Sequence, residues 1–137
     1  MRVFLDANIL LALANPNSHT RLLVDLLLAY HMECLSNAYA VEEARRNLAR
    51  VAPQFSADLD SFLPKIEMVT RLVSKIDITI KSKDLPILYG AIVGKATHLL
   101  TYDAADFGEL MRTPYKGVKV LTPKMMIQEL KSLGIIK

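Results

Sequence analysis

The sequence predicts an α/β protein in which a parallel sheet is covered on both faces by helices. Short apolar runs alternate along the chain with segments whose apolar residues recur at helical spacing. This alternation indicates a parallel sheet, because strands buried on both faces read as continuous apolar runs. Hydrophobic residues make up 52% of the 137 residues, enough for a core, and this excludes a disordered chain. The length fits one domain spanning residues 1–137.

The first part of the chain predicts a strand, two helices and a second strand. Residues 2–5 form an apolar run too short for a helix, and Asp6 ends it, so we expect a buried strand. Residues 9–14 predict a helix that ends at an Asn-Pro-Asn turn. Ser18 is a suitable N-cap for the next helix, and residues 34–36 predict the second strand.

The middle of the chain predicts two more helices and a third strand. Asn37 can cap a third helix, whose apolar residues share one face and which Pro53 ends. A short helix is expected over residues 58–63. Residues 66–69 predict the third strand, although the sequence around them is also compatible with a helix.

The last part of the chain completes the alternation. A helix is predicted over residues 82–95, with Pro86 tolerated in its first turn. Residues 98–101 and 118–121 are apolar runs that predict two further strands. Thr122, followed by a proline, is a capped start for the final helix.

Charge, cysteine content and apolar run length narrow the class of protein. Seventeen Lys and Arg residues against fourteen Asp and Glu residues give a net charge of +3. The single cysteine, Cys34, cannot form an internal disulfide, which indicates a reducing compartment. Asp6 and Asn8 interrupt the only segment that resembles a signal peptide, and no apolar run approaches the roughly 20 residues needed to cross a bilayer. We therefore expect a soluble, cytoplasmic protein with no membrane association.

Acidic residues follow predicted strands or lie in the first turns of predicted helices. Asp6 and Asp103 come just after strands, and Asp84 lies at the start of a helix. Glu42 and Glu43 lie in the first two turns of the third helix, and their spacing does not distinguish one from the other. Because the carboxyl ends of parallel strands meet at one edge of a sheet, we expect these side chains to project toward one rim.

Carboxylates gathered in this way predict a divalent metal site. Crowded carboxylates repel one another unless a cation is present, and Mg²⁺ or Mn²⁺ prefers such oxygen ligands. These ions lower the pKa of bound water and neutralise charge on a phosphodiester. With four acids in one cleft, the remaining surface would hold seventeen bases and ten acids, a balance that attracts a polyanion. The structural alternative is that each aspartate caps the helix or turn after it and that both glutamates are solvated.

Four segments of the chain carry a family pattern. They are VFLDANILLAL, SNAYAVEEARRNL, KDLPILYGAIVGKATHLLTYDAADF and VKVLTPKMMIQEL. In this order they resemble the PIN domain, a family that includes the VapC-like toxins and uncharacterised prokaryotic relatives. The resemblance implies a three-layer α/β/α fold with a parallel sheet of about five strands, and Mg²⁺- or Mn²⁺-dependent hydrolysis of RNA.

The resemblance also implies roles for individual residues. The register to the following Arg and Leu favours Glu43 over Glu42. The family's four acidic positions, which are both catalytic and metal-binding, then correspond to Asp6, Glu43, Asp84 and Asp103. Asp106 corresponds to an accessory metal-binding acid, and Asn8 and Thr101 to groups that orient the carboxylates. The chain departs from the pattern at Tyr102, where the family often has Gly, and matches it only loosely over residues 53–83, which leaves the shape of the substrate open.

The sequence thus favours an endoribonuclease, acting with one or two Mg²⁺ or Mn²⁺ ions on an RNA substrate. The resemblance adds two partner predictions: a homodimer, and a small antitoxin protein that would hold the chain inactive as a toxin. The alternative from another class is a non-catalytic RNA- or protein-binding module on the same scaffold. Candidates for holding the RNA backbone are Arg45, Arg46, Lys81, Lys83, Lys95 and Arg112.

Overall fold

The computed structural model describes residues 1–70, 84–111 and 113–137, and it contains the predicted five-stranded parallel sheet. The strands lie in the order β3-β2-β1-β4-β5. Their bounds are β1 (Arg2–Leu5), β2 (Glu33–Asn37), β3 (Glu67–Val69), β4 (His98–Leu100) and β5 (Lys119–Leu121). The central strand β1 pairs in parallel with both β2 and β4. The order of the strands therefore reverses at β1, and in open α/β sheets such a switch point is where ligands bind.

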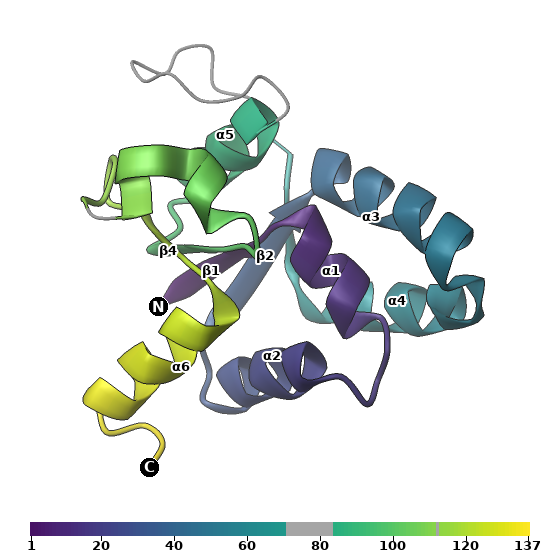
Figure 1. Ribbon diagram of the computed structural model, residues 1–137, viewed down its shortest axis with the longest axis horizontal. Helices are drawn as coiled ribbons and strands as arrows, with labels where there is room; N and C mark the ends of the chain where they lie inside the picture. Colours follow the sequence, from purple (N-terminus) through teal and green to yellow (C-terminus); the bar gives the residue numbers. More distant parts are fainter. Residues whose placement is uncertain (71–83, 112) are drawn as a thin grey trace.

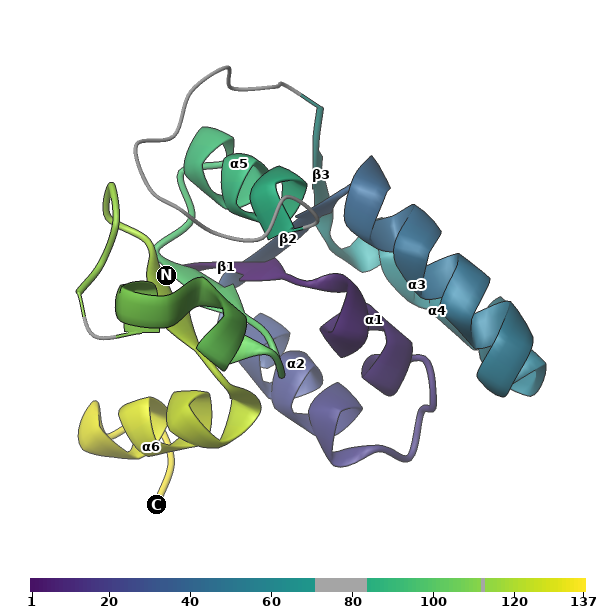
Figure 2. The same ribbon diagram turned by 45° about the horizontal axis from the view of Figure 1, so that its top comes forward.

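Helices cover both faces of this sheet, as the alternating pattern predicted (Figures 1 and 2). On one face lies α5 (Leu85–Val93), and on the other lie α2 (His19–Ala29) and α6 (Pro123–Ser132). The other helical elements are α1 (Ala7–Leu13), α3 (Ala38–Val51), η1 (Pro53–Phe55), α4 (Ser56–Phe62), η2 (Leu63–Lys65) and η4 (Ala104–Met111). α1 packs against both α2 and α3, and η4 packs against β5.

Three predicted N-caps form the expected hydrogen bonds. The side chains of Ser18, Asn37 and Thr122 accept the backbone N–H groups of Arg21, Ala40 and Met125 at 3.0, 3.0 and 3.2 Å. Each cap satisfies a donor that the first turn of a helix leaves unpaired. The three helices therefore begin where the polar residue before the apolar pattern indicated.

Two helix starts differ from the predicted ones. α1 begins at Ala7 rather than at residue 9, because Asp6 accepts the N–H of Ala7 at 2.6 Å and the chain turns directly from strand into helix. α4 begins at Ser56 rather than at residue 58. The start predicted at Ser82 lies outside the described residues, and the described part of that helix begins at Leu85.

The core surrounds the central strands. Phe4 of β1 is fully buried, and its ring lies under α5 at Gly90. A Cβ atom at Gly90 would lie 2.7 Å from the Phe4 ring and 2.5 Å from Asn37 Nδ2, so only glycine lets the helix approach the sheet this closely. Cys34 of β2 is 2% exposed, and burial raises the pKa of its thiol to about 12.

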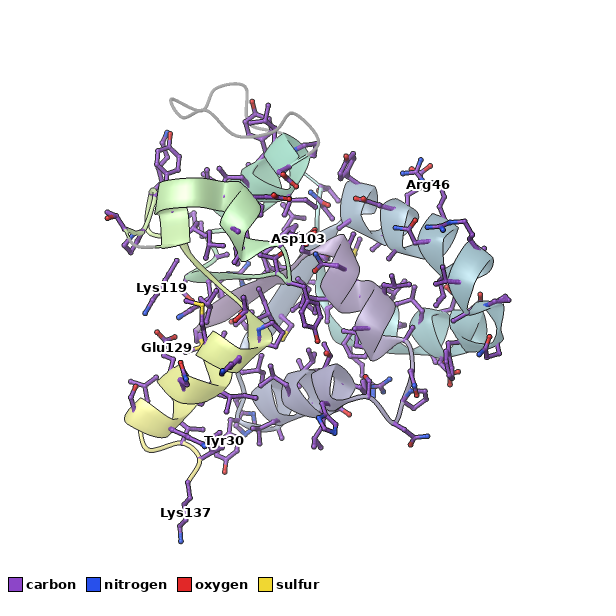
Figure 3. The ribbon with its side chains drawn as sticks, viewed as in Figure 1. Tyr30, Arg46, Asp103, Lys119, Glu129 and Lys137 are labelled. Carbon is purple, nitrogen blue, oxygen red and sulfur yellow. The ribbon has the colours of Figure 1, made fainter. Side chains whose placement is uncertain are left out.

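Charged residues join the elements at the amino ends of the strands and beside β5. Arg2 forms an ion pair with Glu67 at 2.8 Å and a second one with Glu33, which links β1 to β3 and β2. Glu129 of α6 contacts the buried His98 and accepts from Lys119 at 2.6 Å (Figure 3 labels Lys119 and Glu129). His98 therefore has a structural partner. In the part of the chain that the structure describes, no helix is both long and apolar enough to cross a membrane.

Candidate active site

The four acids predicted from the sequence line one small pocket at the carboxyl ends of the strands. Its volume is about 130 Å³, and its walls include Asp6, Glu43, Asp84 and Asp103. Asp6 directly follows β1, Asp103 follows β4 after two residues, Asp84 precedes α5, and Glu43 lies in α3. The topology therefore brings together four side chains that are far apart in the sequence, at the point where the order of the strands reverses.

Asp6 is held by a hydrogen bond to each of its carboxylate oxygens. Oδ1 accepts the N–H of Ala7, and Oδ2 accepts the hydroxyl of Thr101 at 2.7 Å. Thr101 is fully buried, and its oxygen also accepts the backbone N–H of Asp103 at 3.0 Å. The capping role considered from the sequence is therefore real, and the same carboxylate also faces the pocket.

Asn8, at the start of α1, is hydrogen-bonded to the loop after β4 that carries Asp103. Its Nδ2 donates to Asp103 Oδ2 at 3.1 Å and to Thr101 Oγ1 at 3.3 Å, and its Oδ1 accepts the N–H of Tyr102 at 3.1 Å. A side-chain amide that both donates and accepts fixes the loop after β4 against the start of α1. Figure 3 shows Asp103 beside that start. Asn8 and Thr101 thus orient the carboxylates of Asp6 and Asp103.

The environment of Asp6 favours its protonated form. The pKa of Asp6 is raised from 3.8 to about 6, mainly by burial and in addition by the nearby charges of Glu43 and Asp84. The hydrogen bonds from Thr101 and Ala7 act in the opposite direction. The pKa in the folded chain lies above that in the unfolded chain. Protonation of Asp6 therefore stabilises the fold fully below pH 3.8, and this stabilisation is lost as the pH rises through about 6.

We expect the pKa of Asp6 to be higher in the Thr101→Val variant than in the wild type. Valine keeps the shape of threonine but lacks the hydroxyl that donates to the Asp6 carboxylate. Loss of one charge-assisted hydrogen bond raises a carboxyl pKa by roughly one unit. Carbon NMR of the Asp6 carboxyl group in metal-free protein measures the midpoint. Thr101→Ser keeps the hydroxyl and should match the wild type, whereas an unchanged midpoint in Thr101→Val would contradict the assigned bond.

The structure distinguishes the two glutamates that spacing alone left open. Glu43 lines the pocket, whereas Glu42 is exposed and is not among the lining residues. Asp84 occupies the N-cap position of α5, but its side chain makes no capping hydrogen bond there and lines the pocket while being 7% exposed. Asp106, which was predicted as an accessory metal-binding acid, does not line this pocket. Its backbone N–H donates to Asp103 O at 2.9 Å in the turn after β4.

Sequence reasoning missed Asn47, which also lines the pocket. Asn47 is one turn after Glu43 on α3, and residues four apart on a helix lie side by side. A polar residue at this spacing from a candidate ligand was the available signal. Within the described ranges, no three Asp, Glu, His or Cys side chains form a group close enough to hold a metal ion together.

The six basic residues considered as RNA contacts separate into different groups. Arg45 forms an ion pair with Asp60 at 2.9 Å. Arg46 is exposed on α3 (labelled in Figure 3). Lys95 lies near Arg2, at the amino ends of the strands, and therefore at the opposite edge of the sheet from the acidic pocket. The remaining three candidates, Lys81, Lys83 and Arg112, lie outside the described residues.

Comparison with known proteins identifies the fold. No protein-family model and no curated protein matches the sequence. The structure is similar to a chain in the crystal structure of VapBC2 from Rickettsia felis, which was solved bound to a DNA fragment from their promoter. The two share 20% sequence identity with a TM-score of 0.63, over 89% of this chain and 98% of the other. At this identity the likeness shows the fold alone, which is a PIN-like α/β fold with a five-stranded parallel sheet.

Proposed function

We propose that this chain is a metal-dependent endoribonuclease that hydrolyses phosphodiester bonds in RNA. The observation that carries the proposal is the acidic pocket, in which four carboxylates from separate elements converge at the switch point of the sheet. The raised pKa of Asp6 supports it, because this carboxylate is buried near two like charges that a cation would offset. The similarity to a chain of a VapBC complex agrees with this activity.

The residues present fit Mg²⁺ or Mn²⁺. Their donors are all hard oxygens, and the pocket contains neither histidine nor cysteine. Mg²⁺ commonly keeps several waters and uses one or two direct carboxylates, so a site of this kind does not require three clustered acids. Asp6, Glu43, Asp84 and Asp103 would hold one or two ions, directly or through water, and Asp106 would be an accessory acid at the rim.

The chain's own residues would position the reaction. When bound, the metal would neutralise charge on the phosphate and lower the pKa of a water in the site. Thr101 and Asn8 keep the carboxylates of Asp6 and Asp103 in place before substrate arrives, which lowers the cost of ordering the site. One of the four carboxylates would accept the proton of the attacking water.

Cleavage should depend entirely on a divalent ion. Purified protein is expected to cut single-stranded RNA with Mn²⁺ and to stop when EDTA removes the ion, because the carboxylates alone repel a phosphate. Gel analysis of a 5′-labelled RNA measures the rate, and calorimetry with Mn²⁺ measures binding separately. A non-catalytic binding module would bind the RNA without cutting it, whereas cleavage that continues in EDTA would contradict a metal mechanism.

We also propose that the protein acts as the toxin of a toxin–antitoxin pair, with a small antitoxin protein as its partner and a homodimer as its assembly. The structural neighbour belongs to a VapBC complex, and this favours the pairing. Expression of the chain alone should arrest growth, and co-expression of the product of a short adjacent gene should relieve the arrest. Unimpaired growth together with RNA cleavage in vitro would separate the enzyme from a toxin role.

A further inference from the structure

A second pocket adjoins the acidic one, at the ends of β2 and β3. Its volume is about 380 Å³, within the range of small-ligand sites. Aromatic and apolar side chains dominate its walls, including Tyr39, Met68, Pro86 and Tyr89. Tyr39 and Met68 are 37% and 40% exposed, so a ligand can reach them. Of the residues that line it, all of them described, none carries a formal charge.

The two pockets share two structural walls. On α3, Tyr39 lines the apolar pocket and Glu43 lines the acidic one. These residues are four apart, so they are neighbours on one helix face, about 5–6 Å apart at Cβ. On the other side, Asp84 and Pro86 are two residues apart at the start of α5 and line the acidic and apolar pockets respectively.

A hydrogen bond fixes these walls relative to each other. Asn37 Nδ2 donates to Pro86 O at 3.0 Å, while Asn37 Oδ1 caps α3. A Cβ atom at position 90 would lie 2.5 Å from Asn37 Nδ2, so glycine at this position leaves room for that side chain. The starts of α3 and α5 are therefore joined, and the apolar pocket has a fixed place beside the carboxylates.

We propose that the apolar pocket receives one unpaired nucleobase of the RNA whose backbone is cut in the acidic pocket. This inference rests on the proposed function. An uncharged, aromatic-lined wall suits a planar base, because bases in single-stranded RNA are recognised by stacking on aromatic side chains. The charged backbone suits the neighbouring pocket, where a cation would offset the carboxylates. Tyr39 and Glu43 lie one turn apart on α3, so an RNA whose phosphate lies in the acidic pocket has a neighbouring base within reach of Tyr39.

The proposal specifies the form of the substrate. A base that remains paired and stacked in a duplex cannot enter a pocket of this kind without leaving the helix, which costs free energy. The RNA must therefore be single-stranded, or easily unpaired, within one or two nucleotides of the cut bond. Tyr39 is the residue that decides the stacking, because it lies next to Glu43 and is accessible.

An abasic scan tests the proposal. A short single-stranded RNA with one mapped cleavage site is prepared with an abasic ribose at each position in turn. One abasic position near the cut bond should slow wild-type cleavage about tenfold, the order of effect that base–aromatic stacking gives. Tyr39→Ala should slow cleavage of the intact RNA by a similar factor and should no longer respond to that abasic position. Tyr39→Phe keeps the ring and should behave as the wild type does.

A matched control and a binding assay separate the possible outcomes. Tyr30 is an exposed tyrosine at the end of α2, away from the site in Figure 3, and Tyr30→Ala should retain the abasic response. The intact and abasic RNAs can also carry a fluorescent label. Their binding in EDTA, measured by anisotropy, reports on the pocket without catalysis. If no RNA is cut but the abasic effect on binding persists and depends on Tyr39, the proposed function fails and the base pocket stands.

The reverse result is equally decisive. If the wild type cuts RNA but ignores every abasic position, or if Tyr39→Ala keeps the full abasic response, the base pocket is overturned while the nuclease stands. An apolar side chain of a protein partner would then be the better occupant of the pocket.

Discussion

Replacing Asp6 by asparagine is expected to slow Mn²⁺-dependent RNA cleavage by more than about 100-fold, since even changes one shell away from a metal cost 10–100-fold. The amide has nearly the same shape but no negative charge. It also cannot accept both hydrogen bonds that Asp6 accepts, from Ala7 N–H and the Thr101 hydroxyl, because one of its polar atoms is now a donor. The measurement is the single-turnover rate on a labelled RNA, together with Mn²⁺ calorimetry.

The control for this variant is its stability. Above pH 6 the buried, ionised Asp6 destabilises the metal-free fold, and asparagine removes that charge. The melting temperature of Asp6→Asn at pH 8 should therefore not fall far below that of the wild type. Glu42→Gln, beside Glu43 but exposed, should retain full activity. Full activity in Asp6→Asn would reject the metal mechanism, and lost activity with an unfolded protein would leave the loss attributable to folding.

Replacing Phe4 by alanine is expected to lower the free energy of unfolding by about 3–5 kcal/mol, the range for truncating a buried aromatic side chain to alanine. This is the largest loss of stability expected among the variants proposed here. Phe4 is fully buried in the central strand, and its ring lies against α5 at Gly90. Glycine has no side chain that can move into the space, so the cavity collapses poorly. A typical domain is stable by only about 5–15 kcal/mol, so this variant is close to the unfolding threshold.

Chemical denaturation measures this loss, and a double-mutant cycle assigns it. Gly90→Ala alone should destabilise the protein, because the new Cβ meets the Phe4 ring and the amide of Asn37. In the Phe4→Ala background the same change no longer meets the ring and should cost less. Equal costs in both backgrounds would contradict the close contact between the Phe4 ring and Gly90.

The fold was predictable because its signals are local and repeated. Buried parallel strands produce short apolar runs, and caps such as Ser18, Asn37 and Thr122 mark where helices begin. The order of the strands was not predictable from these signals alone. It depends on which strands pair, and β1 pairing with both β2 and β4 is a long-range property of the assembled sheet.

The candidate site was predictable in its acids but not in its distances. The rule that strand ends share an edge places Asp6 and Asp103 together, and the structure agrees. Spacing could not separate Glu42 from Glu43, because both lie at similar angles from the apolar face of α3. The packing of α3 against α1 makes that choice, and it directs Glu43 and Asn47 into the pocket. Lys95 was proposed as an RNA contact because of its charge, but it lies at the edge of the sheet opposite the acidic pocket. Charge alone does not reveal at which edge of the sheet a residue lies.

The buried cysteine makes the molecule suitable for labelling. Thiol reagents attack the thiolate, and at neutral pH Cys34 holds almost none, because its pKa is about 12 and the side chain lies inside β2. The chain contains no other cysteine. A single cysteine introduced on the exposed surface would therefore carry a fluorophore or spin label at one known place, with no need to remove the native sulfur from the core.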